Sequence, residues 1–211
     1  MADLIQIANL SLSRIGTRST IADLAEDSPE ARAFNIIYEQ ARDETLEAVD
    51  WGFARGRRYL ADLGNPPVDW QFRYAYPNDC LKIRSLYQPL AVWRGRLSSI
   101  DSNASADPVP YEVAIDRDGQ GNDLKVIYCD QPQALAFYTR RISNTTLFPP
   151  GFLTALSWAC GAQMAVPLTG NTQLMQACLT MWRDAVGSAA AADANEGFKD
   201  QNVTPDWIAQ R

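Results

Sequence analysis

The sequence predicts an α+β protein: a four-helix bundle with a β-rich insertion between its second and third helices, and an extended C-terminal tail. Apolar residues recur at helical spacing in residues 1–52 and again in residues 149–195. Between them, residues 53–148 hold most of the prolines and aromatic residues, with short β-branched or aromatic runs. Residues 196–211 lose this periodicity. We therefore expect one helical bundle domain, one inserted β-rich domain and a C-terminal docking tail.

The first two helices are predicted from their apolar spacing and their end signals. Residues 3–15 carry apolar residues near helical spacing, and Gly16 follows as a stop signal. A second helix starts with a capping Ser28, Pro29 at the first helical position and Glu30 in the first turn. It is expected to end near Trp51-Gly52 and to bury one stripe, consisting of Phe34, Ile37, Tyr38, Ala41, Thr45 and Ala48. Its charged residues are expected mainly off that stripe: Glu39, Arg42, Asp43, Glu44 and Glu47.

Four strands and one tight turn are predicted in the insertion. The strand signals cover residues 81–86, 111–115, 124–129 and 135–139. Residues 116–122 are rich in turn-forming side chains and predict a hairpin connection between the second and third strands. The Asp-x-Asp start of this turn resembles a calcium loop, but its twelfth position is Ile127 instead of a bidentate glutamate. Gly119-Gln-Gly121 lacks the following Lys-Ser/Thr of a phosphate loop.

Two further helices and the tail complete the chain. The third helix follows Phe148-Pro-Pro-Gly and is expected to run to Pro167, and Gly170 then opens the fourth. The buried side of the fourth helix is predicted to consist of Leu174, Cys178, Met181, Trp182, Ala185 and Ala189. Small residues over 186–194 allow close packing against another helix. The apolar anchors Phe198, Val203, Trp207 and Ile208 on a polar tail predict docking on a partner; folding back on its own chain is the alternative.

Composition excludes several classes of chemistry. The chain has no histidine, which removes histidine-based acid–base catalysis, Ser–His triads and histidine-ligated metal sites. The four cysteines form no C-x-x-C pair and are expected to be reduced and mostly buried. The carboxylates of Asp43, Glu44 and Glu47 share one helix, but on its expected solvent side. We therefore expect a solvated helix face there and no histidine-ligated metal site. The first residues show no signal peptide pattern, and no membrane contact is expected.

Charge is unevenly distributed along the chain. Residues 1–50 carry ten acids and four bases, a net −6, whereas residues 51–100 carry three acids and eight bases, a net +5. The total of −6 argues against a protein that grips nucleic acid over a broad face. The basic candidates cluster in the second segment, where Arg55, Arg57 and Arg58 are followed by Arg73, Lys82, Arg84, Arg94 and Arg96. Arg55, Arg57 and Arg58 are expected to pair with acidic residues of the first segment, within the fold or in a neighbouring subunit, or to line a DNA channel.

Several stretches, in this order, resemble the tail tubular protein A family, the head-to-tail adaptor (connector) proteins of tailed bacteriophages. They are Asn9-Leu-Ser-Leu-Ser-Arg-Ile-Gly16, Tyr38 through Trp51-Gly-Phe-Ala54, Trp70-Gln-Phe-Arg-Tyr-Ala-Tyr-Pro-Asn-Asp-Cys-Leu81, Leu147-Phe-Pro-Pro-Gly-Phe152 and Ala165-Val-Pro-Leu-Thr-Gly170. Each is an aromatic or turn motif without chemistry. Their order and spacing over most of residues 1–195 carry the resemblance.

The resemblance implies a structural virion protein rather than an enzyme, with no catalytic residues, no metal and no cofactor. Such adaptors form a ring of typically twelve copies beneath the portal protein, extend the DNA channel and present the platform for the tail nozzle or tail tube. Double-stranded DNA is then expected to pass without sequence-specific binding. The location implied is the head–tail junction, after assembly in the host cytoplasm. The family's C-terminal segments reach toward the portal, which assigns that role to the tail that bears Phe198, Val203, Trp207 and Ile208.

Three other functions stay open from the sequence. A head-completion connector of a long-tailed phage shares the helical and ring features. A DNA-packaging accessory protein would use the arginine cluster, its sole support. A carboxylate enzyme would need Asp43, Glu44 and Glu47 in a closed site.

Overall fold

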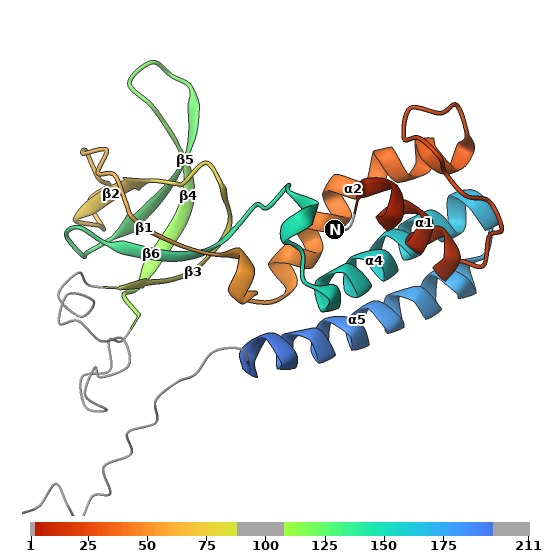
Figure 1. The fold of residues 1–211 in the computed structure, drawn as a ribbon. Helices are drawn as coiled ribbons and strands as arrows, with labels where there is room; N and C mark the ends of the chain where they lie inside the picture. Colours follow the sequence, from red (N-terminus) through yellow and green to blue (C-terminus); the bar gives the residue numbers. More distant parts are fainter. Residues whose placement is uncertain (1–2, 88–107, 196–211) are drawn as a thin grey trace, which may run out of the picture. The chain divides into compact units, whose positions relative to one another are not determined.

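The computed structural model describes residues 3–87 and 108–195, which form a mixed α+β protein (Figure 1). The described chain divides into two units, one of residues 3–55 and 139–195 and one of residues 56–87 and 108–138. The first unit contains the four described α-helices, and the second contains two small sheets. The helices are α1 (Leu4–Arg14), α2 (Pro29–Ala48), α4 (Pro150–Thr169) and α5 (Thr172–Asn195), and two short 3₁₀ helices are η1 (Gly52–Ala54) and η2 (Thr145–Leu147).

Side chains cap the starts of three helices. The Asp3 carboxylate at the start of α1 accepts a hydrogen bond from the Leu4 amide at 2.7 Å. At the start of α2, the Ser28 hydroxyl accepts one from the Ala31 amide at 3.2 Å, which confirms the predicted start. The Asn171 side chain accepts one from the Leu174 amide at 3.1 Å. Each contact satisfies an amide that has no partner inside its helix.

The predicted end of the third helix at Pro167 is wrong. Helix α4 continues through Pro167 to Thr169 and ends where Gly170 takes a left-handed conformation with φ of 68°. Glycine adopts this conformation at little cost, and its amide donates to the Val166 carbonyl at 2.9 Å. A proline this close to a helix end costs only one of the last intrahelical hydrogen bonds.

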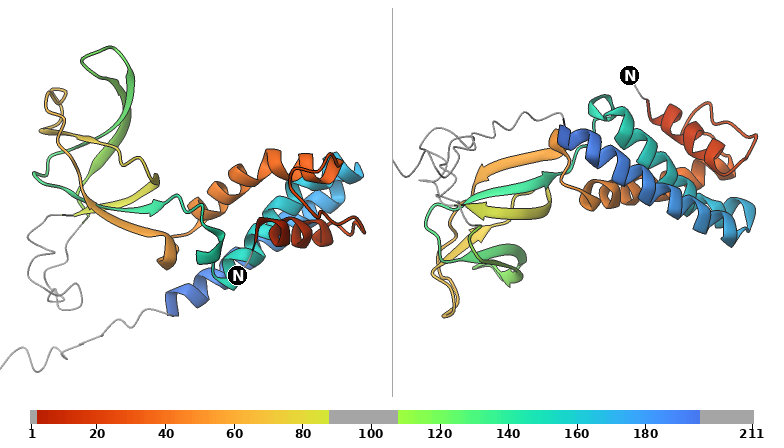
Figure 2. Two further views of the ribbon diagram at one scale, coloured as in Figure 1. Left: turned by 45° about the horizontal axis from the view of Figure 1, so that its top comes forward. Right: turned by 90° about the horizontal axis from the view of Figure 1, so that it is seen from below.

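Helix α4 contacts α1, α2 and α5, so it is the central element of the first unit (Figures 1 and 2). Two glycines permit close approach. A Cβ on Gly151 would lie 2.9 Å from the Ala189 Cβ of α5, and one on Gly161 would lie 3.3 Å from the Arg14 Cβ of α1. The small residues predicted to allow close packing of the fourth helix therefore include Ala189, which meets α4 directly.

An aromatic cluster joins the end of α2 to the start of α4. The Phe152 ring lies 5.4 Å from the Trp51 ring and 5.1 Å from the Phe53 ring, measured between centroids. Phe148 packs against Phe152 at 4.8 Å. Trp51 is buried and donates its indole N–H to the Thr45 carbonyl at 2.9 Å. Edge-to-face packing of this kind adds stabilisation beyond the burial of area.

Helix α4 is long and apolar enough to cross a membrane by length and composition, with a mean hydropathy of 1.2 in its most apolar window. Of that window, 56% is buried inside the protein, by the helices that pack on α4. A core helix buried on several sides has this composition because most of its faces contact other helices. The described residues contain no other helix that passes this test.

The second unit contains two three-stranded sheets with strand orders β1-β6-β3 and β2-β5-β4. The strands are β1 (Arg55–Tyr59), β2 (Phe72–Ala75), β3 (Cys80–Tyr87), β4 (Tyr111–Arg117), β5 (Asp123–Cys129) and β6 (Leu135–Arg140). In the second sheet β5 pairs antiparallel with both neighbours, with Ile127 opposite Tyr74 on one side and Val113 on the other. The four predicted strands are confirmed with extended ends, whereas β1 and β2 were not predicted.

The predicted hairpin turn between β4 and β5 is also confirmed. The Asp118 carboxylate accepts hydrogen bonds from the Gln120 and Asn122 amides, each at 2.8 Å. Gly121 follows with φ of 87°. The pKa of Asp118 is lowered, chiefly because the Asn122 side chain donates a hydrogen bond to its carboxylate. These local contacts engage the carboxylate that a calcium loop would use as a ligand.

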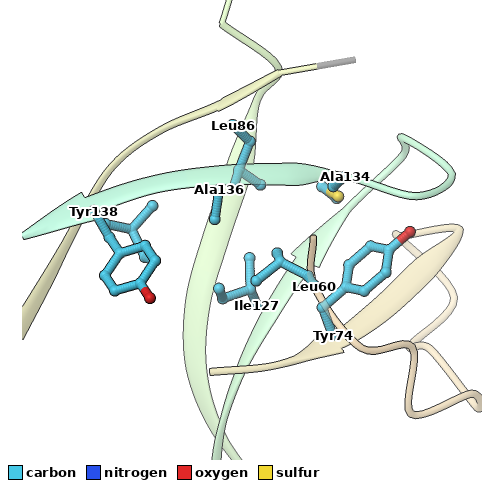
Figure 3. Close-up of a cluster of buried hydrophobic side chains, with 9 residues drawn as sticks. Leu60, Tyr74, Leu86, Ile127, Ala134, Ala136 and Tyr138 are labelled. Atoms are coloured by element: carbon cyan, nitrogen blue, oxygen red, sulfur yellow. The ribbon is translucent and has the colours of Figure 1, made fainter. Parts of the chain in front are cut away.

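The two sheets bury a common core. Leu86, Ala136 and Tyr138 come from one sheet and Tyr74 and Ile127 from the other. Leu60, directly after β1, lies with Ile127 between the rings of Tyr74 and Tyr138 (Figure 3). This shared core gives the second unit a hydrophobic interior of its own.

Candidate interaction surfaces

The three arginines of the predicted basic cluster all lie exposed on or at the end of β1, but their surroundings differ. Arg55 pairs with Asp50, with 2.9 Å between the guanidinium Nη2 and the carboxylate Oδ2. The Arg57 guanidinium lies 5.0 Å from the centroid of the Phe137 ring on β6. Arg58 is exposed on the next position of the strand. Because successive strand residues point to opposite faces, the structure does not gather the three side chains on one face.

Other basic residues of the predicted segment lie on other strands. Lys82 and Arg84 are on β3, which β6 separates from β1 in their sheet. Arg73 is buried on β2, with its Nε 2.9 Å from the Asp116 Oδ2 and its Nη2 donating to the Arg117 carbonyl. Hydrogen bonds from the Arg117 amide and the Tyr128 hydroxyl lower the pKa of Asp116. The positive charge of Arg73 is therefore compensated by Asp116 within the second unit. The predicted positions Arg94 and Arg96 lie outside the described residues.

The predicted docking anchors of the tail also lie outside the described residues: Phe198, Val203, Trp207 and Ile208. Their role therefore stays a prediction.

An ion-pair network at α2 joins Arg42, Asp43 and Arg141. Arg42, predicted off the apolar stripe, is buried with its side chain only 6% exposed. Its Nη2 lies 2.8 Å from the Asp43 Oδ1, and its guanidinium lies 5.7 Å from the Tyr38 ring centroid. The other oxygen of Asp43 is 2.9 Å from the Nε of Arg141, which follows β6. Periodicity assigns charged residues to solvent, but a paired arginine can be buried.

An apolar groove lies between α4 and α5, within the first unit. Its volume is about 460 Å³, and Trp158, Met181, Ala185 and Ala189 contribute to its lining. Met181 was predicted on the buried side of its helix, and this is wrong, since it is 44% exposed. Helix α5 contacts α4 along one narrow face, where Cys178 and Ala189 are its buried residues. Side chains at the edge of so narrow a face stay open to solvent.

Several large apolar side chains project from other elements. Ile36 on α2 is 79% exposed, Tyr59 on β1 is 54% exposed and Ile115 on β4 is 77% exposed. Tyr59 and Ile115 lie on strands at the edges of their sheets. Single exposed apolar residues are common on proteins, so these positions acquire meaning only together with their charged neighbours.

The cysteines and acidic side chains of the described residues form no cluster suited to a metal ion. Within residues 3–87 and 108–195, no three histidine, cysteine or acidic side chains gather as a metal site would require. The four cysteines are free, and Cys129, Cys160 and Cys178 are buried, as predicted. Burial raises the pKa of the Cys160 thiol to about 12 and also raises those of Cys129 and Cys178. A thiol with a raised pKa is a poor nucleophile at neutral pH.

No protein-family model matches the chain, and no curated protein matches it significantly. The assignment to an adaptor family therefore depends on the resembling stretches and on the physical arguments from the surfaces above.

Proposed function

We propose that this chain is a structural virion protein, a head-to-tail adaptor that forms a ring below the portal. In this proposal the ring extends the DNA channel and carries the tail nozzle or tail tube, and the four helices form a bundle. The adaptor is neither a catalyst nor a sequence-specific DNA-binding protein.

The single observation that carries the proposal is the meeting of two resembling stretches in one packed cluster. Trp51 and Phe53 come from the second resembling stretch, and Phe148 and Phe152 come from the fourth. Their rings are in contact, with centroid distances of 4.8 to 6.2 Å. Residues shared with a family for the sake of packing are expected to meet in this way.

The other resembling stretches also lie at positions that set the fold. Asn9 donates to the Ile21 carbonyl at 2.9 Å and accepts from the Ile21 amide at 2.7 Å, which fixes the segment after α1. Tyr76 donates to the Leu81 carbonyl at 3.2 Å, and Gly170 ends α4. These stretches therefore support a shared architecture, from which the adaptor function is inferred by analogy.

A ring assembled from one kind of subunit repeats a heterologous contact, so each subunit must carry two different complementary faces. An acidic first segment and a basic strand β1 meet this requirement. The acidic total charge of −6 also suits a channel that must release DNA, because a lining of like charge does not hold phosphates.

The experiment that tests the proposal removes the C-terminal docking tail. Deleting residues 197–211 should leave a folded, soluble protein that no longer binds portal-bearing capsids, because the apolar anchors for the portal are lost. Circular dichroism checks the fold and capsid pull-down measures binding. The paired variants Trp207→Ala/Ile208→Ala and Gln201→Ala/Asn202→Ala refine it: the first should lose binding and the second should keep it. Binding that survived the deletion would contradict the docking role.

A further inference from the structure

We propose that one face of α2 in one copy binds strand β1 of the next copy in the ring. The acidic α2 face consists of Ile36, Glu39, Gln40 and Glu44; the arginine strand consists of Arg57, Arg58 and Tyr59. This inference rests on the proposed ring, and it names the two surfaces that would form each contact between neighbours.

The acidic α2 face follows from helical geometry. Residues at spacings of three, four, seven and eight share one side of a helix, which places Glu39, Gln40 and Glu44 around and beyond Ile36. Glu39 and Glu44 are exposed, as is Ile36. The Glu44 carboxylate accepts hydrogen bonds from the Gln40 amide at 2.8 Å and from the Gln163 amide at 3.2 Å. Two neutral amides orient this carboxylate and leave its negative charge uncompensated.

The two arginines of α2 itself have partners of their own. Arg32, one turn before Ile36, pairs with Asp27. Arg42 is buried and pairs with Asp43, which also binds Arg141. The charge of the acidic α2 face is therefore net negative, and an exposed isoleucine lies at its edge.

The arginine strand has the opposite character. Strand β1 lies at the edge of its sheet, and the residues from Arg57 to Tyr59 are exposed. Within residues 3–87 and 108–195, none of the ion pairs involves Arg57 or Arg58, whereas Arg55 pairs with Asp50. The Phe137 ring supports the Arg57 guanidinium and thereby reduces the entropy lost when it binds a carboxylate. Arg57 and Tyr59 project from one face of the strand and Arg58 from the other, so the two charges flank the outer edge of β1. Tyr59 adds an exposed apolar ring on the face of Arg57.

The two surfaces complement each other in charge and in composition. Each presents exposed charges of one sign and one large apolar side chain, Ile36 on one and Tyr59 on the other. Since the surfaces are different, their contact is heterologous and propagates around a ring, as a self-complementary patch would not. Opposite charges at a rim fix register and speed association more than they add affinity, and salt weakens them. Ring formation is therefore expected to slow as ionic strength rises.

Two charge-reversed variants test the contact. Glu39→Lys/Glu44→Lys makes both surfaces positive, and Arg57→Glu/Arg58→Glu makes both negative, so each variant alone should lose the ring species. Mixed in equal amounts, they should recover it, because every contact then joins a positive surface to a negative one in an alternating ring. Such a ring has an even number of subunits. Analytical ultracentrifugation and negative-stain images, with and without portal, measure assembly.

A control and two contrary outcomes make the test decisive. Arg18→Glu/Arg183→Glu changes the net charge by the same amount as Arg57→Glu/Arg58→Glu, at exposed positions outside both surfaces. This control should assemble like the wild type. Circular dichroism confirms that each variant is folded. If the wild type forms rings but the mixture recovers none, or if either variant assembles alone, the proposed contact is wrong and the adaptor function stands. If the wild type forms no ring with or without portal, the adaptor function fails.

Discussion

Asp43 holds two arginines, one buried and one exposed. Its two carboxylate oxygens lie 2.8 Å from the Arg42 Nη2 and 2.9 Å from the Arg141 Nε. Arg42 is 6% exposed, so its charge has little access to water when Asp43 is neutralised. Arg141 is 55% exposed and can be hydrated instead. The cost of removing the Asp43 charge therefore falls mainly on Arg42.

Asp43→Asn should destabilise the protein by about 2 kcal/mol, because it leaves a buried guanidinium without a counter-ion. Arg42→Met should cost less, about 1 kcal/mol, since it removes the buried charge and leaves Asp43 paired with Arg141. Urea denaturation monitored by circular dichroism measures both. A larger loss for Arg42→Met than for Asp43→Asn would show that packing of the arginine stem outweighs its pairing.

Sequence patterns predicted the class of partner for one arginine and missed the burial of another. Arg55, Arg57 and Arg58 were expected as a surface cluster, and all three are exposed. The pairing of Arg55 with Asp50 confirms for this residue the expected pairing with an acid of the first segment. Which acid it pairs with depends on how the chain turns between α2 and β1, and no periodicity encodes that. The burial of Arg42 was missed for the same reason, since it depends on Asp43 and on a chain segment that follows β6.

At the scale of elements, the approach of α4 to α5 depends on the absence of a side chain at Gly151. A Cβ at this position would lie 2.9 Å from the Ala189 Cβ, closer than two such atoms pack. Neither atom belongs to a flexible side chain, so the helix backbones would have to move apart.

Gly151→Ala should therefore destabilise the protein by about 1–3 kcal/mol through overpacking. Ala189→Gly alone should cost about 1 kcal/mol from its lower helix propensity. The double variant Gly151→Ala/Ala189→Gly should be more stable than the sum of the two predicts, because the second change makes room for the first. Thermal unfolding of the four proteins measures this coupling. Additive effects would argue that the two residues do not share a contact.

The elements predicted from the sequence are those with strong periodicity or clear end signals. The start of α2 at Ser28-Pro29 is confirmed to the residue, and the four expected strands are present. Strands β1 and β2 were missed: β1 reads Arg-Gly-Arg-Arg-Tyr with one buried position, and β2 has only four residues. An edge strand of charged residues lacks the alternation by which strands are recognised. The end of α4 was predicted too early because Pro167 is a strong stop signal. The helix continues past it for two residues and ends at Gly170.

At the scale of the whole molecule, the charge distribution favours the proposed adaptor over a DNA-packaging accessory protein. The chain has a net charge of −6 and a sequence pI near 4.7. Of the eight basic residues in its most basic segment, Arg73 and Arg55 are already paired within the chain. A groove for duplex DNA would need a continuous basic path, and these pairings interrupt it.

The protein should accordingly fail to retard duplex DNA in a mobility shift assay at moderate salt, whereas a packaging factor would retard it. Fluorescence anisotropy of a labelled duplex at several salt concentrations provides the quantitative form of this test. Tight binding with a steep salt dependence would reveal several phosphate contacts and would favour the packaging role.

The first unit is assembled from two separate parts of the chain, residues 3–55 and residues 139–195. Its central helix, α4, follows the six described strands in the sequence, while α1 and α2 precede them. During translation, the ribosome must therefore synthesise all of the described strands before Trp51 can pack against Phe152 of α4. The nascent polypeptide is therefore expected to carry uncovered apolar surface throughout that interval, the kind of surface that chaperones bind.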